Sequence, residues 1–268
     1  MITDDMTRFL NAAGKAADPD SLDAAFADWT NLGRYTGFRR SEWCQKTQTV
    51  FQKIEDWEGQ PAQAMILEDF EFYGPGGRRI YDMSRVTWKD IDMIKIRWRK
   101  QKNGNNGQTI TYKRDYKNPD FCPVRAAYNI YLRAIRLNVP KGEPIAVFKG
   151  KDGKRLFITE QMVTDKLREA AHKVLGLKKD DPEIMKWSSH SIRVTACNLL
   201  HRKRFSDSFI KNRLRWESDA FLVYLRNTIY AAEDHTKALE LSSNNLPVGA
   251  SYRRESSPED ILWVARAA

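Results

Sequence analysis

The sequence is poor in cysteine, and its cysteines are not spaced as metal ligands or disulfide partners. Cys44, Cys122 and Cys197 are an odd number, lie far apart and form no C-x-x-C pair. This pattern argues against a disulfide framework and against a zinc knuckle. We expect three reduced thiols, as is usual for an intracellular protein.

Histidine is also scarce, with four in the whole chain. His172, His201 and His235 show no metal-ligand spacing with one another or with the cysteines. We therefore interpret them as ordinary core or surface residues, and we expect neither a bound metal nor another cofactor.

The chain lacks the segments that direct a protein into or across a membrane. Its first residues, MITDDMTRFL, contain no basic region followed by an apolar run. No stretch of about 18 residues is apolar throughout. We expect no signal peptide, no membrane span and an intracellular location, in the nucleus if the source is eukaryotic and in the cytoplasm if it is bacterial or viral.

Acidic residues are outnumbered by basic ones. The 268 residues include 45 Lys and Arg against 35 Asp and Glu, which gives a formal net charge of +10. A hydrophobic content of 41% is enough for a packed core. The excess of positive charge indicates a polyanionic partner, and nucleic acid is the first candidate.

Apolar residues at helical spacing predict several amphipathic helices. Behind a start signal at 19–21, Leu22, Phe26, Trp29 and Leu32 indicate a helix over residues 20–35. Similar patterns predict helices over residues 123–137, 162–175, 188–201, 207–216 and 219–232. Ser188 or Ser189 is the expected cap of the helix over 188–201. Residues 46–85, with the turn YGPGGRR, are predicted to form a β-containing insertion.

A β-hairpin is predicted over residues 86–114. Three apolar side chains alternate with three basic ones over residues 94–99, two Asn-Gly pairs follow, and TITY at 109–112 returns as a second strand. Residues 95–117 contain eight Lys and Arg but one acid, Asp115. Six to eight phosphate contacts would make DNA affinity fall about 10³–10⁵-fold between roughly 50 and 200 mM salt. The cations that we expect to contact DNA are Lys95, Arg97, Arg99, Lys100, Lys113 and Arg114.

Two pairs of functional residues share a three-residue spacing. His190 and Arg193 lie on one face of the predicted helix over 188–201, whereas the apolar residues of that helix point elsewhere, toward a core. Arg39 and Glu42 follow a glycine turn in TGFRRSEW, residues 36–43. Farther along the chain, Trp216 precedes a tyrosine by eight residues.

The order of these segments resembles the catalytic domain of the tyrosine recombinases, the phage-integrase family that includes Cre-type enzymes. The matching features are T-G-x-R-x-S-E, a basic hairpin, H-x-x-R, and then a tryptophan and a tyrosine, over about residues 20–228. The resemblance implies an α+β fold that is mainly helical, with a small antiparallel sheet at one edge. It also implies DNA strand cleavage and rejoining through a covalent 3′-phosphotyrosine without a metal, by a tetramer on paired sites in double-stranded DNA.

The resemblance also implies a role for each matching residue. Arg39 is the first phosphate-binding arginine and Glu42 a supporting acid. His190 and Arg193 form the second motif, and Trp216 occupies the position of a histidine or tryptophan. Tyr224 is the implied nucleophile.

Two roles have alternatives. The catalytic lysine of the family lies on the hairpin, where Lys102 is favoured and Lys100 is the alternative. Tyr230 is the alternative nucleophile, because the spacing from Trp216 to Tyr224 is one residue shorter than is usual in the family.

The residue types suit attack on a phosphodiester. Arginines bind the charge that builds up on the non-bridging oxygens, in the place that a metal occupies elsewhere. An unperturbed tyrosine ionises near pH 10, so at neutral pH it needs cationic neighbours and a proton acceptor, a role that His190 can fill. The lysine would protonate the 5′-hydroxyl leaving group, and the Trp216 indole N–H can bind a phosphate oxygen.

We expect residues 1–240 to form this catalytic domain, with 46–85 as an enlarged insertion, and residues 241–268 to form a linker and a short C-terminal helix. Because 38 residues precede Arg39, the family's helical DNA-binding domain is expected to be missing from this sequence. Two alternatives remain open. One is an inactive DNA-binding relic of a mobile element, and the other is a type IB topoisomerase-like enzyme, which would carry lysine in place of His190.

Overall fold

The computed structural model of the chain describes residues 1–101, 104 and 106–225. These residues form an α+β fold, as predicted. The helices are α1 (Asp4–Ala16), α2 (Leu22–Thr36), α3 (Pro123–Arg136), α4 (Glu160–Leu175), α5 (Pro182–Met185), α6 (His190–Arg202) and α7 (Asp207–Leu214). None of them is long and apolar enough to cross a bilayer.

The larger sheet has four antiparallel strands in the order β2-β1-β3-β4. Its strands are β1 (Phe70–Tyr73), β2 (Arg79–Ile80), β3 (Met93–Trp98) and β4 (Gln108–Lys113). Strands β3 and β4 form the predicted hairpin, in which Ile96 lies opposite Ile110. A second, two-stranded sheet pairs β5 (Val147–Lys149) with β6 (Arg155–Phe157).

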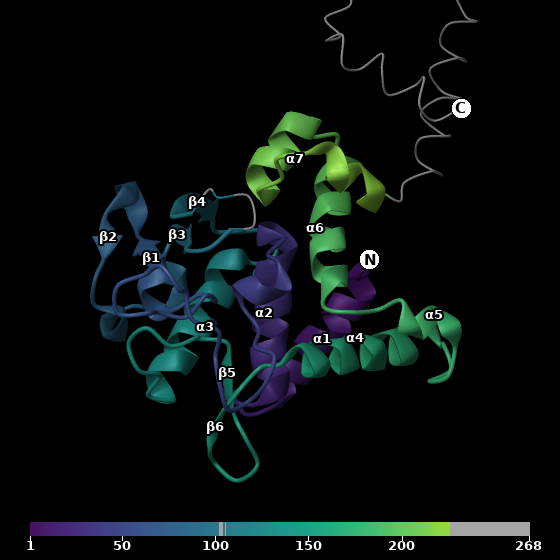
Figure 1. The fold of residues 1–268 in the computed structure, drawn as a ribbon, viewed down its shortest axis with the longest axis horizontal. Coiled ribbons are helices and arrows are strands. Elements are labelled where there is room, and N and C mark those ends of the chain that lie inside the picture. The colour runs from purple at the N-terminus through teal and green to yellow at the C-terminus, as the bar shows by residue number, and fades with distance from the viewer. Residues whose placement is uncertain (102–103, 105, 226–268) are drawn as a thin grey trace, which may run out of the picture. The chain divides into compact units, whose positions relative to one another are not determined.

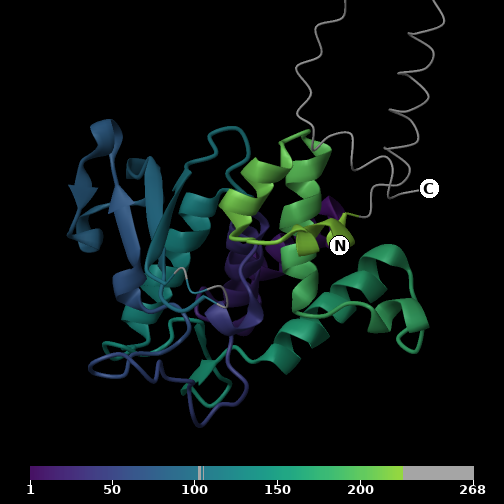
Figure 2. The same cartoon turned by 45° about the horizontal axis from the view of Figure 1, so that its top comes forward.

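Helix α2 lies between the larger sheet and α6 in both views (Figure 1, Figure 2). Ser21 caps it by accepting a hydrogen bond from Ala24 N, which confirms the predicted start. The Trp29 ring stacks on Trp43, with 5.1 Å between centroids, and the Phe38 ring lies 5.0 Å from Trp43. All three rings are buried. This aromatic cluster fixes residues 36–43, the TGFRRSEW motif, against the core.

Helix α1 was not predicted from the sequence. Thr3 caps it, and Met6 and Leu10 are buried on its inner face. Ile2 is also buried, and its backbone N–H donates to Thr195 Oγ1 of α6 at 2.7 Å. The start of the chain is therefore bonded to the helix that carries the H-x-x-R motif.

Three further expectations need correction or fall outside the described residues. The Ser189 side chain makes no capping bond at the start of α6; instead, Ser191 Oγ accepts from Ser188 N. The predicted helix over 219–232 begins as a 3₁₀ turn, Asp219–Tyr224, and its later part is not described. The expected linker and C-terminal helix over 241–268 also lie outside the described residues, as do Lys102 and Tyr230.

Candidate functional site

A cleft of about 710 Å³ opens where the first turn of α6 faces residues 39–41 and the segment after α7. Its walls come from parts of the chain that are far apart in sequence. Five of the six residues predicted to be catalytic line it, and the sixth, Lys102, is not described. The five are Arg39, His190, Arg193, Trp216 and Tyr224.

Arg39 reaches the cleft because α2 ends in a tight turn. Gly37 has φ 52°, in the left-handed region, and a Cβ on it would lie 2.9 Å from Leu214 Cδ2. The chain then places Arg39 before a 3₁₀ turn, Arg40–Glu42. Glu42 accepts from Arg39 N at 2.6 Å and from Arg39 Nη1 at 3.1 Å. The acid that the sequence predicted to be supporting therefore orients Arg39 directly.

Arg193 lines the cleft and is 2% exposed. Its guanidinium donates to Gly37 O and, at 3.1 Å, to Leu214 O. It also lies against Trp216, with Cζ 4.1 Å from the ring centroid. Burial and, to a smaller extent, the charge of nearby Arg39 together lower the pKa of Arg193 to about 9.

Around Glu42, arginines outnumber the acid. Arg39 and a third arginine, Arg215, pair with this buried carboxylate, and Arg193 lies near it. Elsewhere on the cleft wall Arg40 pairs with Glu160, and Glu217 is a further acid. Because burial makes an uncompensated positive charge costly, an anion bound in the cleft would stabilise this arrangement. A phosphate group has the charge and the oxygen atoms that such a cluster prefers.

Three rings form the wall opposite Arg39. The Tyr224 ring lies 4.8 Å from His190 and 5.3 Å from Trp216, measured between centroids. In the part of the chain that the structure describes, Trp216 Nε1 is buried and meets no hydrogen-bond acceptor. This indole N–H is therefore an unsatisfied donor, which would reach an oxygen of a bound group after a shift of the ring.

The backbone of Tyr224 is fixed by a hydrogen bond from α6, and the side chain of Phe221 anchors the same turn in the core. Asn198 Nδ2 of α6 donates to Tyr224 O at 2.6 Å. Phe221 is fully buried in a small cluster with Ile210 and Leu214, whereas Tyr224 is only partly buried. Phe221 therefore provides the core packing of this turn, and the Tyr224 side chain faces the cleft.

The basic side chains of the β3–β4 hairpin depart most from the sequence-based prediction, because several of them are paired with acidic side chains. Lys95 pairs with Glu71 at 2.6 Å, and Arg114 with Asp92 at 3.3 Å. Arg97 and Arg99 share the buried Asp69, at 3.1 and 2.8 Å.

Arg99 is 7% exposed, so its predicted position on a solvent-facing cationic surface is wrong. The sequence count missed Glu71 and Asp69 because they come from β1 and the turn before it, more than 20 residues away. Of the two candidate lysines, Lys100 lies 3.8 Å from Asp56 and does not line the cleft.

These pairs lower the salt dependence that follows from the sequence-based hypothesis of DNA binding. With Arg99 buried and several cations shared with acids, we expect about four to six phosphate contacts, and a loss of about 10²–10³ in affinity between roughly 50 and 200 mM salt. Alanine variants of Lys113, which is exposed, and of Arg99, which is buried, test whether only exposed hairpin cations contact phosphate. Lys113→Ala should reduce the salt slope by about 1, and Arg99→Ala should leave it unchanged. Fluorescence anisotropy over a salt series measures both, and a flat dependence would refute hairpin–phosphate contacts.

Arg215 was missed by sequence reasoning. It follows α7 with φ 60°, is 2% exposed and pairs with Glu42 at 2.8 Å. An arginine at a helix end is usually solvated, and its partner here is 173 residues away. One local feature could have drawn attention to Arg215. It occupies the left-handed position after α7, where Gly or Asn is the usual residue.

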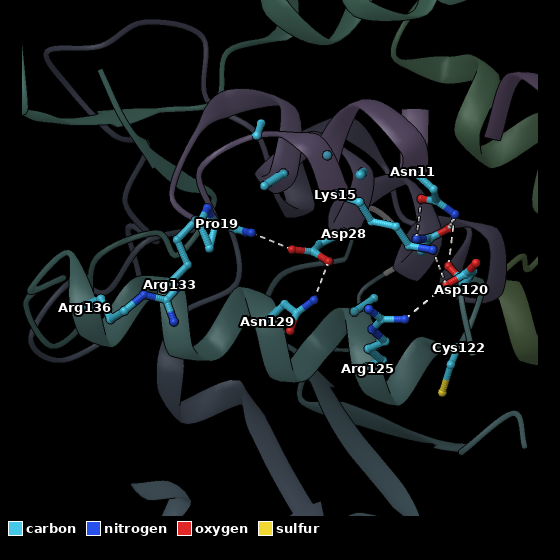
Figure 3. A pocket seen from close by; sticks show the side chains of 16 residues that line it. Asn11, Lys15, Pro19, Asp28, Asp120, Cys122, Arg125, Asn129, Arg133 and Arg136 are labelled. Carbon is cyan, nitrogen blue, oxygen red and sulfur yellow. Dashed lines mark hydrogen bonds and ion pairs between the residues drawn. The ribbon is translucent and has the colours of Figure 1, made fainter. Parts of the chain in front are cut away.

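A second hollow, of about 340 Å³, lies between α1, α2 and α3 (Figure 3). Its charged groups pair with one another: Arg133 Nη2 bonds to Asp28 at 2.5 Å, and Arg125 Nη1 to Asp120 at 3.1 Å. Burial raises the pKa of Asp28, although Arg133 opposes this shift. Arg133 thus ties α3 to α2, and Lys15 of α1 pairs at 2.7 Å with Asp120, just before α3. We assign this hollow a structural role.

No protein-family model and no curated protein sequence matches this chain. Any functional assignment therefore rests on the residues of the cleft and their chemistry. The described residues contain no group of three or more His, Cys, Asp or Glu side chains that could hold a metal ion.

Proposed function

We propose that this protein breaks and rejoins DNA strands as a tyrosine recombinase, with the cleft beside α6 as its active site. The observation that carries the proposal is the convergence of Arg39, Arg193 and Tyr224 on one cleft, although Arg39 lies more than 150 residues from the other two. The α+β architecture with a hairpin at the sheet edge is compatible with the catalytic domain of that family. Double-stranded DNA and a tetramer on paired sites are part of the proposal.

The proposed reaction is an in-line exchange at phosphorus. The Tyr224 oxygen forms a bond to the phosphorus of a backbone phosphodiester, and the bond from phosphorus to the 5′ oxygen breaks. The phenol proton passes to His190, whose ring is adjacent to Tyr224, and the leaving 5′ oxygen takes a proton from the hairpin lysine, Lys102 or Lys100. Attack by a 5′-hydroxyl on the phosphotyrosine reverses the step, and exchanges strands when that hydroxyl belongs to another duplex.

The arginines and Trp216 serve the transition state. Negative charge grows on the non-bridging oxygens during attack, and donors that are already oriented stabilise it without reorganisation. Arg39 is held by Glu42, and Arg193 by two backbone carbonyls, so neither guanidinium has to be ordered when DNA binds. The Trp216 N–H is a further donor on the same wall.

Trapping of a covalent adduct tests the proposal. Duplexes that bind the protein are selected from a random pool and rebuilt with a nick, so that the short cleaved fragment diffuses away and rejoining fails. We expect an adduct that survives denaturing electrophoresis, joins the protein to a 3′-phosphate, and forms equally in EDTA. A protein that binds its selected duplexes but links to none would be the inactive DNA-binding relic. Relaxation of supercoiled plasmid without a selected site would favour the topoisomerase-like alternative.

A further inference from the structure

Arg215 has a backbone conformation that glycine would adopt more easily. Its φ of 60° and ψ of 52° are left-handed, and its N–H caps α7 by donating to Lys211 O. Glycine is the usual residue here because it has no Cβ to clash with the neighbouring carbonyl. An arginine at this position therefore carries a backbone penalty, which the contacts of its side chain must offset.

The side chain of Arg215 joins three elements. Nη2 donates to Glu42 Oε2 at 2.8 Å, and Nη1 donates to Thr36 O at the end of α2 at 3.1 Å. The guanidinium carbon lies 3.4 Å from the Trp98 ring centroid. Trp98 ends β3, two residues before Lys100, so the same guanidinium connects the hairpin to the cleft.

The backbone around Arg215 holds both cleft arginines. Arg215 O accepts from Arg39 Nη2 at 3.2 Å, and Leu214 O accepts from Arg193 Nη2 at 3.1 Å. Two consecutive carbonyls of one turn thus orient the two guanidinium groups. The next residue, Trp216, lines the cleft itself.

We propose that Arg215 is a positioning residue for strand cleavage, an inference that rests on the proposed function. Its ion pair with Glu42 and its contact with Trp98 fix the turn over 214–216, and this turn aims Arg39 and Arg193 at the scissile phosphate. Without this side chain, buried Glu42 keeps Arg39 as its cationic partner among the cleft arginines and draws that guanidinium away from the phosphate. Loss of the Arg215 side chain should therefore lower the rate of cleavage and leave the DNA affinity unchanged, because the exposed cations proposed to bind DNA are still present.

Three variants test this role. Arg215→Gly removes the side chain and suits the left-handed backbone, whereas Arg215→Lys keeps the charge without the planar fork. Arg204→Gly is the matched control, because Arg204 has φ 59°, is exposed and does not line the cleft. Single-turnover cleavage of the nicked substrate at saturating DNA gives the rate constant, anisotropy gives Kd, and thermal melting reports folding.

We expect Arg215→Gly to lower the cleavage rate constant on the order of 10²-fold, as misplacement of a catalytic group by about 1 Å does, with Kd changed less than about threefold. Arg215→Lys should lose less, and Arg204→Gly should remain within about twofold of the parent. In an Arg39→Ala background, Arg215→Gly should add less than its full loss, because the part of its effect that acts through Arg39 is already gone and only the part that acts through Arg193 remains.

Several results would overturn the inference. A folded Arg215→Gly variant that cleaves like the parent would do so, and so would a full additional loss in the Arg39→Ala background. If Arg215→Gly does not fold, Arg215→Lys decides, and parental cleavage by that variant rejects the role. A parent protein that forms no adduct rejects the proposed function itself, whereas an active parent with an equally active variant rejects only the role of Arg215.

Discussion

Replacing Tyr224 by phenylalanine is expected to abolish the covalent protein–DNA adduct completely. The substitution removes one oxygen atom, and no other atom of the ring can form the bond to phosphorus. Folding and DNA affinity should stay within about 1 kcal/mol of the parent, because Phe221 provides the core packing of this turn and Asn198 binds the Tyr224 backbone, not its hydroxyl. Adduct yield on denaturing gels and anisotropy with the same duplex measure the two effects.

Tyr230→Phe is the control for the nucleophile, and it should form the adduct at the parental level. An adduct that persists in Tyr224→Phe and disappears in Tyr230→Phe would transfer the role to Tyr230. An adduct that persists in both variants would mean that neither tyrosine attacks the DNA.

Removing either cleft arginine is expected to slow cleavage about 10²–10³-fold, because each supplies preorganised donors to the charge that develops at phosphorus. The two variants should differ in stability. Arg39 has 24% of its side chain exposed, and its loss leaves Glu42 paired with Arg215. Arg193→Ala instead leaves two buried carbonyls, Gly37 O and Leu214 O, without this donor, at a cost of about 1–3 kcal/mol each.

Single-turnover cleavage and thermal melting separate these effects. Arg39→Ala should melt close to the parent, whereas Arg193→Ala should melt several degrees lower, at about 2–4 °C per kcal/mol. Both should still bind DNA, because the exposed hairpin lysines remain. Rapid cleavage by a folded Arg39→Ala variant would exclude Arg39 from the reaction, and equal melting temperatures would contradict the structural role of the Arg193 hydrogen bonds.

Regular periodicity made the main helices and the hairpin predictable. Apolar residues at positions 22, 26, 29 and 32 marked α2, and Ser21 marked its start, because an amphipathic helix encodes its own boundaries locally. The same rule would have found α1, where Ile2, Met6 and Leu10 recur every fourth residue. The turn at Asp219–Tyr224 was predicted as an α-helix because its apolar spacing fits either form.

The cleft was only partly predictable. His190 and Arg193 share a helix face, so their proximity follows from spacing alone. The burial of Arg99 on Asp69 and of Arg215 on Glu42 depends on which elements pack together, and no local pattern encodes a partner 30 or 173 residues away. The sequence pattern placed Arg99 among the DNA-binding cations and gave Arg215 no role, although the fold uses both to hold its strands and turns together.

The attachment of the chain's first residues to α6 has a practical consequence for every assay above. Ile2 is buried with its N–H bonded to Thr195, and Met1 lines a small hollow together with Trp187, Ser188 and His190. A purification tag or fluorescent label joined ahead of Met1 would therefore emerge beside the histidine proposed to accept the tyrosine proton. Such a fusion would crowd the side of the molecule where we propose that DNA binds, so any tag at this end should be cleaved before binding or cleavage is measured.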